Sequence, residues 1–270
     1  MSLNILMIGD VVGGPGRKLV SQLVPRLIRR WNLGLVVCNS ENSAGGSGLT
    51  TSCYEEIVES GVDVITMGDH IYRKDDIYAL IDRDPRILKP ANYPEESPGS
   101  EYFITKARDG TPVAAFSLMG RTFMKPVDDP FRAANRVLDK IGTQTKVILV
   151  DHHAEATSDK QLMGRHLDGR VSAVMGTHTH VATADEQILK GGTAYQTDLG
   201  MTGPYDSILG RRVDRVMTST MTLMPNHFDV ATGDPRLCGA YIEIDPATGK
   251  ATSIRRVSID QAEAQKIMTA

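Results

Sequence analysis

The feature that most constrains the fold is a series of short apolar runs, each followed by turn residues and then by a helical pattern. The first three runs are Leu3–Ile8, Leu35–Cys38 and Val62–Met67. Strands that are apolar on both faces are typical of sheets covered by helices. Because strand-length and helix-length segments alternate along the chain, the pattern predicts an α/β fold of βα units rather than a strand-only sandwich.

The segments between these runs have helical spacing. A glycine-rich stretch, Gly13–Gly16, leads into a helix predicted over Lys18–Arg30, whose leucines recur every four residues on one face. Hydroxyl side chains at Thr50–Ser52 are suited to cap a second helix over Tyr54–Glu59. The first third of the chain therefore consists of strands joined by helices.

The rest of the chain continues this alternation and ends in a hairpin. The hairpin is expected to be antiparallel and to turn at residues 246–249. No repeat or long linker divides the sequence, so residues 1–270 are expected to form a single domain. The further strands expected are Val113–Met119, Val147–Val150, Val171–Met175, Ala240–Ile244 and Ser253–Ser258, and the further helices are Phe131–Ile141 and Asp159–Arg165.

Composition excludes several classes of protein. The formal charge is −3, from 30 Lys and Arg against 33 Asp and Glu, so no global field would hold a nucleic acid and no stable nucleic-acid complex is expected. No window reaches the ~18–20 apolar residues of a membrane span, and the first residues lack the basic start of a signal peptide. Cys38, Cys53 and Cys238 have no CxxC spacing, which indicates reduced thiols. We therefore expect a cytoplasmic protein that does not bind membranes and that can form a homo-oligomer.

Polar residues of the metal-ligating types cluster directly after the apolar runs. Ligands of open α/β sheets bind beyond the carboxyl ends of the strands, and five of the seven histidines stand there. The other two, His166 and His227, are expected to be structural or solvated. The residues at the strand ends are Asp10, Glu41, Asn42, Asp69, His70, Asp151, His152, His153, His178 and His180.

Carboxylates and imidazoles together favour zinc, manganese or iron, because pure magnesium sites seldom use histidine. There are more candidate ligands than one metal can use, and Glu41 is suited to bridge two cations ~3.5–4 Å apart. His178 and His180 are expected on the same side of an extended segment. Taken alone, Asp10 could cap a helix and Gly13–Gly16 is a weak phosphate-loop signal without Walker spacing. Together the residues predict a centre with two metals.

Five ordered motifs and a later glycine-rich segment make the chain recognisable. It resembles the YmdB-like branch of the calcineurin-type metallophosphoesterases, over most of its length to about residue 210. The resemblance implies an α/β sandwich of mixed sheets flanked by helices, a dinuclear metal site, and phosphodiesterase activity toward 2′,3′-cyclic nucleotides. The motifs are Ile8–Gly13, Glu41–Gly46, Gly68–His70, Asp151–Ser158 and Gly176–Val181, with Gly191–Asp198 and Gly203-Pro204 beyond them.

The resemblance also implies roles for individual residues. Asp10 and His180 would bind the first metal, Glu41 would bridge both, and Asn42 would ligate a metal or orient phosphate. The second metal would take Glu41 with the ligands Asp69, His153 and His178. His70 matches a histidine that acts as acid or transition-state donor. Because His152 adjoins His153, the sequence leaves open which of the two ligates, although the spacing favours His153.

One residue departs from the family pattern. The third motif usually reads Gly-Asn-His, whereas here it reads Gly-Asp-His, with Asp69 at the ligand position. With two divalent metals, a bridging hydroxide and three carboxylates, the core charge sums to zero instead of +1. A less positive centre attracts phosphate less and acidifies bound water less, while it holds the metals more firmly.

The expected reaction is in-line attack of a metal-bridging hydroxide on a phosphodiester, with His70 protonating the leaving oxygen. Iron or manganese is favoured, and zinc or magnesium are the other candidates. Arg121, Thr202 and Tyr205 are weaker candidates for contacts with a small phosphodiester or cyclic-nucleotide substrate. One alternative is an amidohydrolase-like enzyme, although its HxH pair normally opens the first strand of a barrel. The other is a weakly active or non-catalytic metal-binding regulatory protein.

Overall fold

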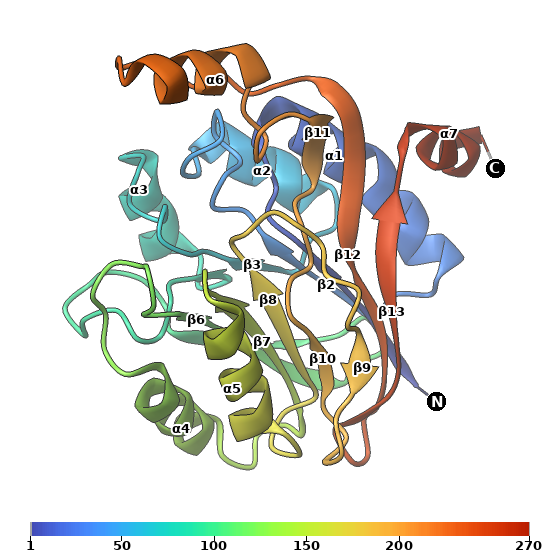
Figure 1. Cartoon of the computed structure of the whole chain (residues 1–270). Coiled ribbons are helices and arrows are strands. Elements are labelled where there is room, and N and C mark those ends of the chain that lie inside the picture. The colour runs from blue at the N-terminus through green and yellow to red at the C-terminus, as the bar shows by residue number, and fades with distance from the viewer. Residues whose placement is uncertain (1, 270) are drawn as a thin grey trace.

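The computed structural model describes residues 2–269 and has two mixed β-sheets packed face to face (Figure 1). The first sheet has a parallel half, formed by β1 to β4, and an antiparallel half, in which β12 pairs with β1 and with β13. Its strands, in spatial order, are β11 (Gly203–Asp206), β12 (Gly233–Asp245), β1 (Leu3–Ile8), β2 (Leu35–Asn39), β3 (Val64–Thr66) and β4 (Ile87–Leu88), with β13 (Lys250–Ile259) on β12.

The second sheet has a parallel centre and antiparallel edges. Strands β6, β7, β8 and β10 run parallel, while β5 and β9 run antiparallel to their neighbours. The carboxyl ends of the parallel strands therefore all lie at the same end of the sheet. The order is β5 (Tyr102–Lys106), β6 (Pro112–Met119), β7 (Val147–His153), β8 (Ala173–Thr177), β10 (Ala194–Gln196) and β9 (Gln187–Ile188).

Helices cover the outer faces, so the molecule has four layers. Alternate residues of each strand point to opposite faces: Ile5 packs between the sheets, whereas its neighbour Leu6 packs under the helices of the first sheet. Those helices are α1 (Gly13–Arg30), α2 (Thr51–Glu59), α3 (Asp76–Arg83) and α7 (Gln261–Thr269). Helices α4 (Pro130–Ile141) and α5 (Thr157–Leu167) cover the second sheet, and α6 (Val213–Thr222) projects at one end (Figure 1).

The predicted α/β fold of mixed sheets flanked by helices is confirmed, and so is the C-terminal hairpin of β12 and β13. The side chain of Thr50 caps α2, accepting a hydrogen bond from the backbone of Cys53. Among residues 2–269 the structure has no helix that is both long and apolar enough to cross a membrane.

The expected start of the first helix is wrong. Helix α1 begins at Gly13 rather than Lys18, so the glycine-rich stretch forms its first turn. Proline is tolerated there because the first N–H groups of a helix have no intrahelical partner. At Gly16 a Cβ atom would collide with the backbone oxygen of Thr202, so glycine allows the helix to approach the neighbouring strand.

Several other boundaries differ. Strand β7 runs on to His153, three residues beyond the predicted end, and β8 begins at Ala173 and ends at Thr177. The polar residues Asp151 and His152 therefore belong to the strand. Both are buried, and their backbones pair with β6 and β8. Helices α3, α6 and α7 and the short strands β4, β5, β9, β10 and β11 were not predicted, since most lack a long periodic pattern.

Candidate metal centre

The predicted site residues gather where the carboxyl ends of the two sheets meet. The first sheet contributes the carboxylates, with Asp10 following β1, Glu41 following β2 and Asp69 following β3. The second sheet contributes imidazoles. His153 is the last residue of β7, and His178 is the first residue after β8. Residues more than 100 positions apart in the chain therefore face one another across the two sheets.

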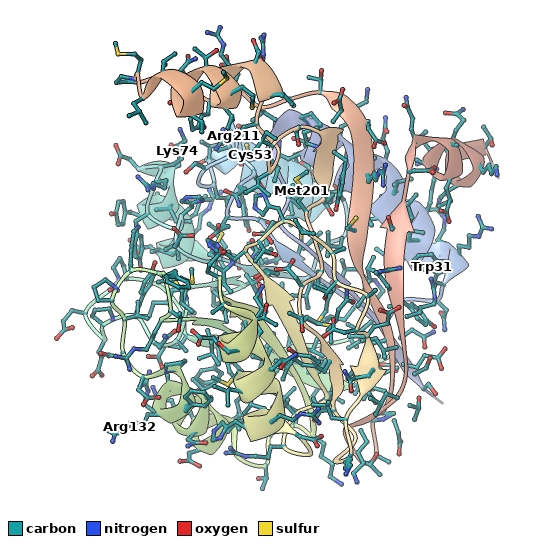
Figure 2. All side chains as sticks on the ribbon, viewed as in Figure 1. Trp31, Cys53, Lys74, Arg132, Met201 and Arg211 are labelled. Atoms are coloured by element: carbon teal, nitrogen blue, oxygen red, sulfur yellow. The ribbon has the colours of Figure 1, made fainter. Side chains whose placement is uncertain are left out.

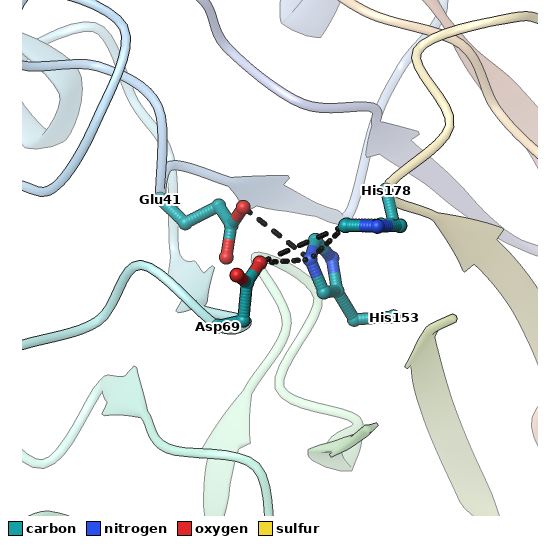
Figure 3. A group of neighbouring side chains, drawn as sticks. All are labelled: Glu41, Asp69, His153 and His178. Atoms are coloured by element: carbon teal, nitrogen blue, oxygen red, sulfur yellow. Dashed lines mark hydrogen bonds and ion pairs between the residues drawn. The ribbon is translucent and has the colours of Figure 1, made fainter. Parts of the chain in front are cut away.

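Four of these side chains form a compact cluster (Figure 3). Glu41, Asp69, His153 and His178 each offer one ligand atom, and these atoms all lie within 4.8 Å of one another. Nε2 of His153 lies 3.3 Å from Glu41 Oε1, 3.3 Å from Asp69 Oδ1 and 3.0 Å from His178 Nδ1. Two imidazole nitrogens and two carboxylate oxygens converging on one point fit a transition-metal site.

A glycine makes this approach possible. A Cβ atom at Gly68 would collide with Oε2 of Glu41 and with the ring of His153. Any side chain at that position would push apart two of the four ligands. The space available beside the cluster therefore explains why the Gly68–His70 motif has glycine at its first position.

A second group lies next to the first. Oδ1 of Asp10 lies 3.7 Å from His180 Nε2, and Asn42 Nδ2 lies 3.2 Å both from that same nitrogen and from Glu41 Oε1. Asp10 is fully buried, and its Oδ1 has no hydrogen-bond partner. Buried polar atoms are normally satisfied, so an orphaned carboxylate oxygen facing an imidazole fits a second cation. Glu41 belongs to the first group and is linked to the second through Asn42 Nδ2.

Burial and the neighbouring charges shift the pKa values of the cluster side chains in different directions. Burial raises the pKa of Asp10 to about 6, against the opposing effect of His180 and His153. Burial also works to raise the pKa of Glu41, but His153 and His70 hold that pKa well below its usual range. Burial lowers the pKa of His178 to about 4, with His153 adding to the effect. His178 is therefore a neutral imidazole with a lone pair available to a metal.

The orientation of the His153 ring is fixed from behind. The hydroxyl of Thr177 donates to Asp151 Oδ1 at 2.6 Å and lies 2.9 Å from His153 Nδ1. Because the single hydroxyl proton is given to Asp151, the hydroxyl accepts the N–H of Nδ1. Nε2 is consequently the nitrogen presented to the cluster, an arrangement typical of metal-ligating histidines.

His152 does not reach the cluster. It points to the opposite face of β7 from His153, is buried, and has no hydrogen-bond partner at either ring nitrogen. Burial lowers its pKa to about 3, so the ring is neutral. Asp151 is not part of the cluster, and its carboxylate accepts hydrogen bonds from Asn39, Thr66 and Thr177 behind the His153 ring.

His70 lies at the edge of the cluster, with its side chain 27% exposed. Its Nδ1 lies 2.8 Å from Asn42 Oδ1, and its backbone N–H donates to Glu41 Oε2 at 3.2 Å. The amide of Asn42 gives an N–H to Glu41, so its oxygen accepts from Nδ1 of His70. The other ring nitrogen, Nε2, lies 3.7 Å from Asp69 Oδ2.

The expectation of an extended segment at the last two histidines is wrong. Strand β8 ends at Thr177, and the backbone is left-handed at both His178 (φ 97°) and His180 (φ 63°). The backbone N–H of His178 donates to Asp10 Oδ2 at 3.0 Å. The turn that results sends His178 to the cluster of Figure 3 and His180 toward Asp10.

Two of the expected substrate contacts are engaged elsewhere. Thr202 is buried, and its hydroxyl exchanges hydrogen bonds with the backbone of Cys238. The hydroxyl of Tyr205 bonds to the backbone oxygen of Met201 and contacts the Cys238 thiol. The hydroxyls of both side chains therefore have partners within the protein. Arg121 is exposed beside Asp159, which accepts its backbone N–H, and its role stays a prediction.

Sequence reasoning missed two cations near the site. Lys125 Nζ donates to the backbone oxygen of Asp69 at 3.3 Å, from a proline-rich loop without a motif. Arg211, below α6 in Figure 2, donates to the backbone oxygens of Gly45 and Gly46 in the loop after Glu41. His166 contacts Asn135 and His227 is exposed, so both lie outside the centre as expected.

The chain is similar to known proteins over nearly its full length. The family model of YmdB-like proteins matches residues 6–257. The chain is 46% identical to a 2′,3′-cyclic-nucleotide 2′-phosphodiesterase of Bacillus subtilis, over 96% of this chain and 97% of the relative.

Two solved structures share the fold over nearly the full length. A hypothetical protein of Thermus thermophilus has a TM-score of 0.88 and 39% identity, covering 96% of this chain and 99% of its own. A novel phosphatase of Mycoplasma pneumoniae has a TM-score of 0.90 and 29% identity, covering 98% of this chain and 97% of its own. The family match over most of the chain and this shared architecture lead to one conclusion: the chain belongs to the YmdB-like family.

Proposed function

We propose that this protein is a dinuclear metal-dependent phosphodiesterase that hydrolyses 2′,3′-cyclic nucleotides. The observation that carries the proposal is the pair of adjacent ligand groups. Glu41 belongs to the cluster with Asp69 and two imidazoles, and the Asn42 amide links it to His180, which faces the orphaned oxygen of Asp10. The substrate class rests on the name of the Bacillus subtilis relative.

The two groups of side chains would hold one metal each. Asp10 and His180 would bind the first, and Asp69, His153 and His178 the second, with Glu41 shared. Iron or manganese suits this mixture of oxygen and nitrogen ligands. When bound, the ions supply positive charge to the phosphoryl oxygens and lower the pKa of water.

Asn42 and His70 act on the substrate side of the centre. The amide oxygen of Asn42 is turned to His70, which supports a role in orienting phosphate and His70 rather than in ligating metal. With Nδ1 held by that oxygen, a protonated His70 offers its Nε2–H to the leaving oxygen of the ester. Its partial exposure leaves room for a substrate beside it.

The test is a substrate panel run on protein whose metal content has been measured. Protein reconstituted with manganese or iron is expected to open a 2′,3′-cyclic nucleotide faster than a linear diester, because the strained five-membered phosphate needs less help with its leaving group. Metal-loaded protein that turns over no diester would contradict the proposal and favour a regulatory protein that keeps its metals.

A further inference from the structure

A buried ion pair lies behind the loop that carries two of the proposed metal ligands. Asp198, after β10, and Lys160, near the start of α5, are each 1% exposed, and the ammonium group of Lys160 donates to Asp198 Oδ2. Burying two charges costs free energy, and the cost is offset only where further hydrogen bonds satisfy them. The other hydrogen bonds of this pair therefore indicate which segment of the chain it holds in place.

The remaining bonds of Asp198 go to the ligand loop and to the turn beside it. Oδ2 accepts from the backbone N–H of Thr179 at 3.2 Å and from its hydroxyl at 2.7 Å, while Oδ1 accepts from the backbone N–H of Gly200 at 2.8 Å. Thr179 is the residue between His178 and His180. One carboxylate thus holds the midpoint of the segment that supplies an imidazole to each metal position.

That segment needs an anchor because its backbone is left-handed at both histidines. Residues other than glycine are disfavoured in that conformation, and they persist in it only when the surrounding structure fixes them. The backbone bonds from His178 to Asp10 and from Thr179 to Asp198 hold the two halves of the turn.

The path of Lys160 to this carboxylate depends on a glycine. A Cβ atom at Gly176, in β8, would lie 3.0 Å from Cδ of Lys160 and would collide with the backbone oxygen of Thr197. The absence of a side chain there lets the lysine stem pass from α5 beside β8 to Asp198. The Gly176–Val181 and Gly191–Asp198 motifs are therefore joined through this pair.

We infer that Asp198, fixed by Lys160, is a positioning residue that holds the loop His178–His180 in the conformation in which its two imidazoles face the metal positions. The inference rests on the metal centre proposed above. Asp198 is not one of the proposed ligands, and it acts on the ligand loop through Thr179. Because the loop is already ordered, metal binding does not have to order it, and partners that orient ligands in this way typically contribute about 10–100-fold in metal affinity.

The most selective test removes one hydroxyl. Thr179→Val deletes the 2.7 Å bond to Asp198 and leaves the backbone bond. Affinity for manganese, measured by chelator competition without substrate, is expected to fall about 10-fold, while the melting temperature of the metal-free protein stays close to that of the wild type. Thr179→Ser keeps the hydroxyl and is expected to restore the affinity.

A matched control lies at the far end of the sheet. Thr248→Val removes a similar threonine-to-aspartate bond, of 2.8 Å to Asp245, in the turn between β12 and β13. That turn adjoins the amino end of β1, opposite the metal positions. Its manganese affinity is expected to match the wild type.

A second variant, Asp198→Asn, removes the partner of both Lys160 and Thr179. It is expected to lower the affinity at least as much as Thr179→Val, and adding Thr179→Val to it should lower the affinity little further. Wild-type affinity in Thr179→Val, or an equal loss in Thr248→Val, would overturn the inference. Wild-type protein that binds no manganese would overturn it along with the metal centre. If the wild type binds metal but hydrolyses no diester, only the proposed activity fails.

Discussion

The two sheets contribute different chemistry to the same centre. The carboxyl end of the first sheet carries the proposed oxygen ligands, which are Asp10, Glu41 and Asp69 on short loops that follow parallel strands. The carboxyl end of the second sheet carries the proposed nitrogen ligands, which are His153 at a strand end and His178 and His180 on a left-handed turn.

This difference shows that neither sheet can form the centre alone. A carboxylate edge by itself would suit hard cations, and an imidazole edge would lack the negative charge that balances two metals. Bound metal would therefore fasten one sheet to the other, and it would stabilise the folded protein according to its concentration relative to its Kd. The variants below separate the contributions of the two edges.

The largest effect is expected at Glu41, the residue that both proposed metal positions share. It lies among the carboxylates at the end of the first sheet, which we call the oxygen edge. Glu41→Gln should lower metal content from two ions per chain toward none and reduce turnover by about 10³-fold, the size of several kcal/mol of lost charge stabilisation. Elemental analysis after reconstitution, alongside kcat, checks this. Full occupancy in the variant would show that Glu41 does not bridge.

The imidazoles at the end of the second sheet form the nitrogen edge. Two adjacent histidines that point to opposite faces of β7 test its role. His153→Gln is expected to cost one metal per chain and at least about 10²-fold in turnover, because a ligand of the second position is lost. His152→Leu should keep both metals, since it replaces an imidazole with no hydrogen-bond partner by an apolar group. The opposite pattern of metal content would reverse the assignment.

A smaller effect is expected for His70, which lies on the oxygen edge but is not placed as a ligand. His70→Ala should lower kcat by about 10²-fold, the scale of an acid–base group, with metal content unchanged. Parallel measurements of kcat and bound metal decide the point. If the variant loses metal, His70 is a ligand and the division between the two edges is incomplete.

The smallest effect is expected at Asp69, the carboxylate that stands where the family pattern usually has asparagine. Asp69→Asn makes the centre more positive by one charge, so it should raise turnover or shift the alkaline limb of the pH profile downward, while it weakens metal affinity. A pH–rate profile and a chelator titration measure both quantities. If neither changes, the extra carboxylate has no functional effect and the charge argument fails.

The candidate ligands could be proposed from the sequence because they follow local patterns. Asp10, Glu41 and His153 each come at or just after the end of an apolar run, and strand ends face a common edge in α/β sheets. The hydrogen bonds of Thr202 and Tyr205 could not be predicted, for the converse reason. Their motif is local, but the partner that engages their hydroxyls, Cys238, lies more than 30 residues further along the chain.

Local sequence patterns predicted the longer strands and helices, the faces that they bury, and the residue types available to bind metal. The short elements were not predicted, and neither were the assignment of strands to sheets, the place of β12 beside β1, or the left-handed turn held by Asp198 between His178 and His180. The reason is the separation along the chain of the residues that interact. Periodicity reports the burial of neighbouring residues, whereas strand pairing and the Lys160–Asp198 contact depend on groups that meet only after the chain has folded.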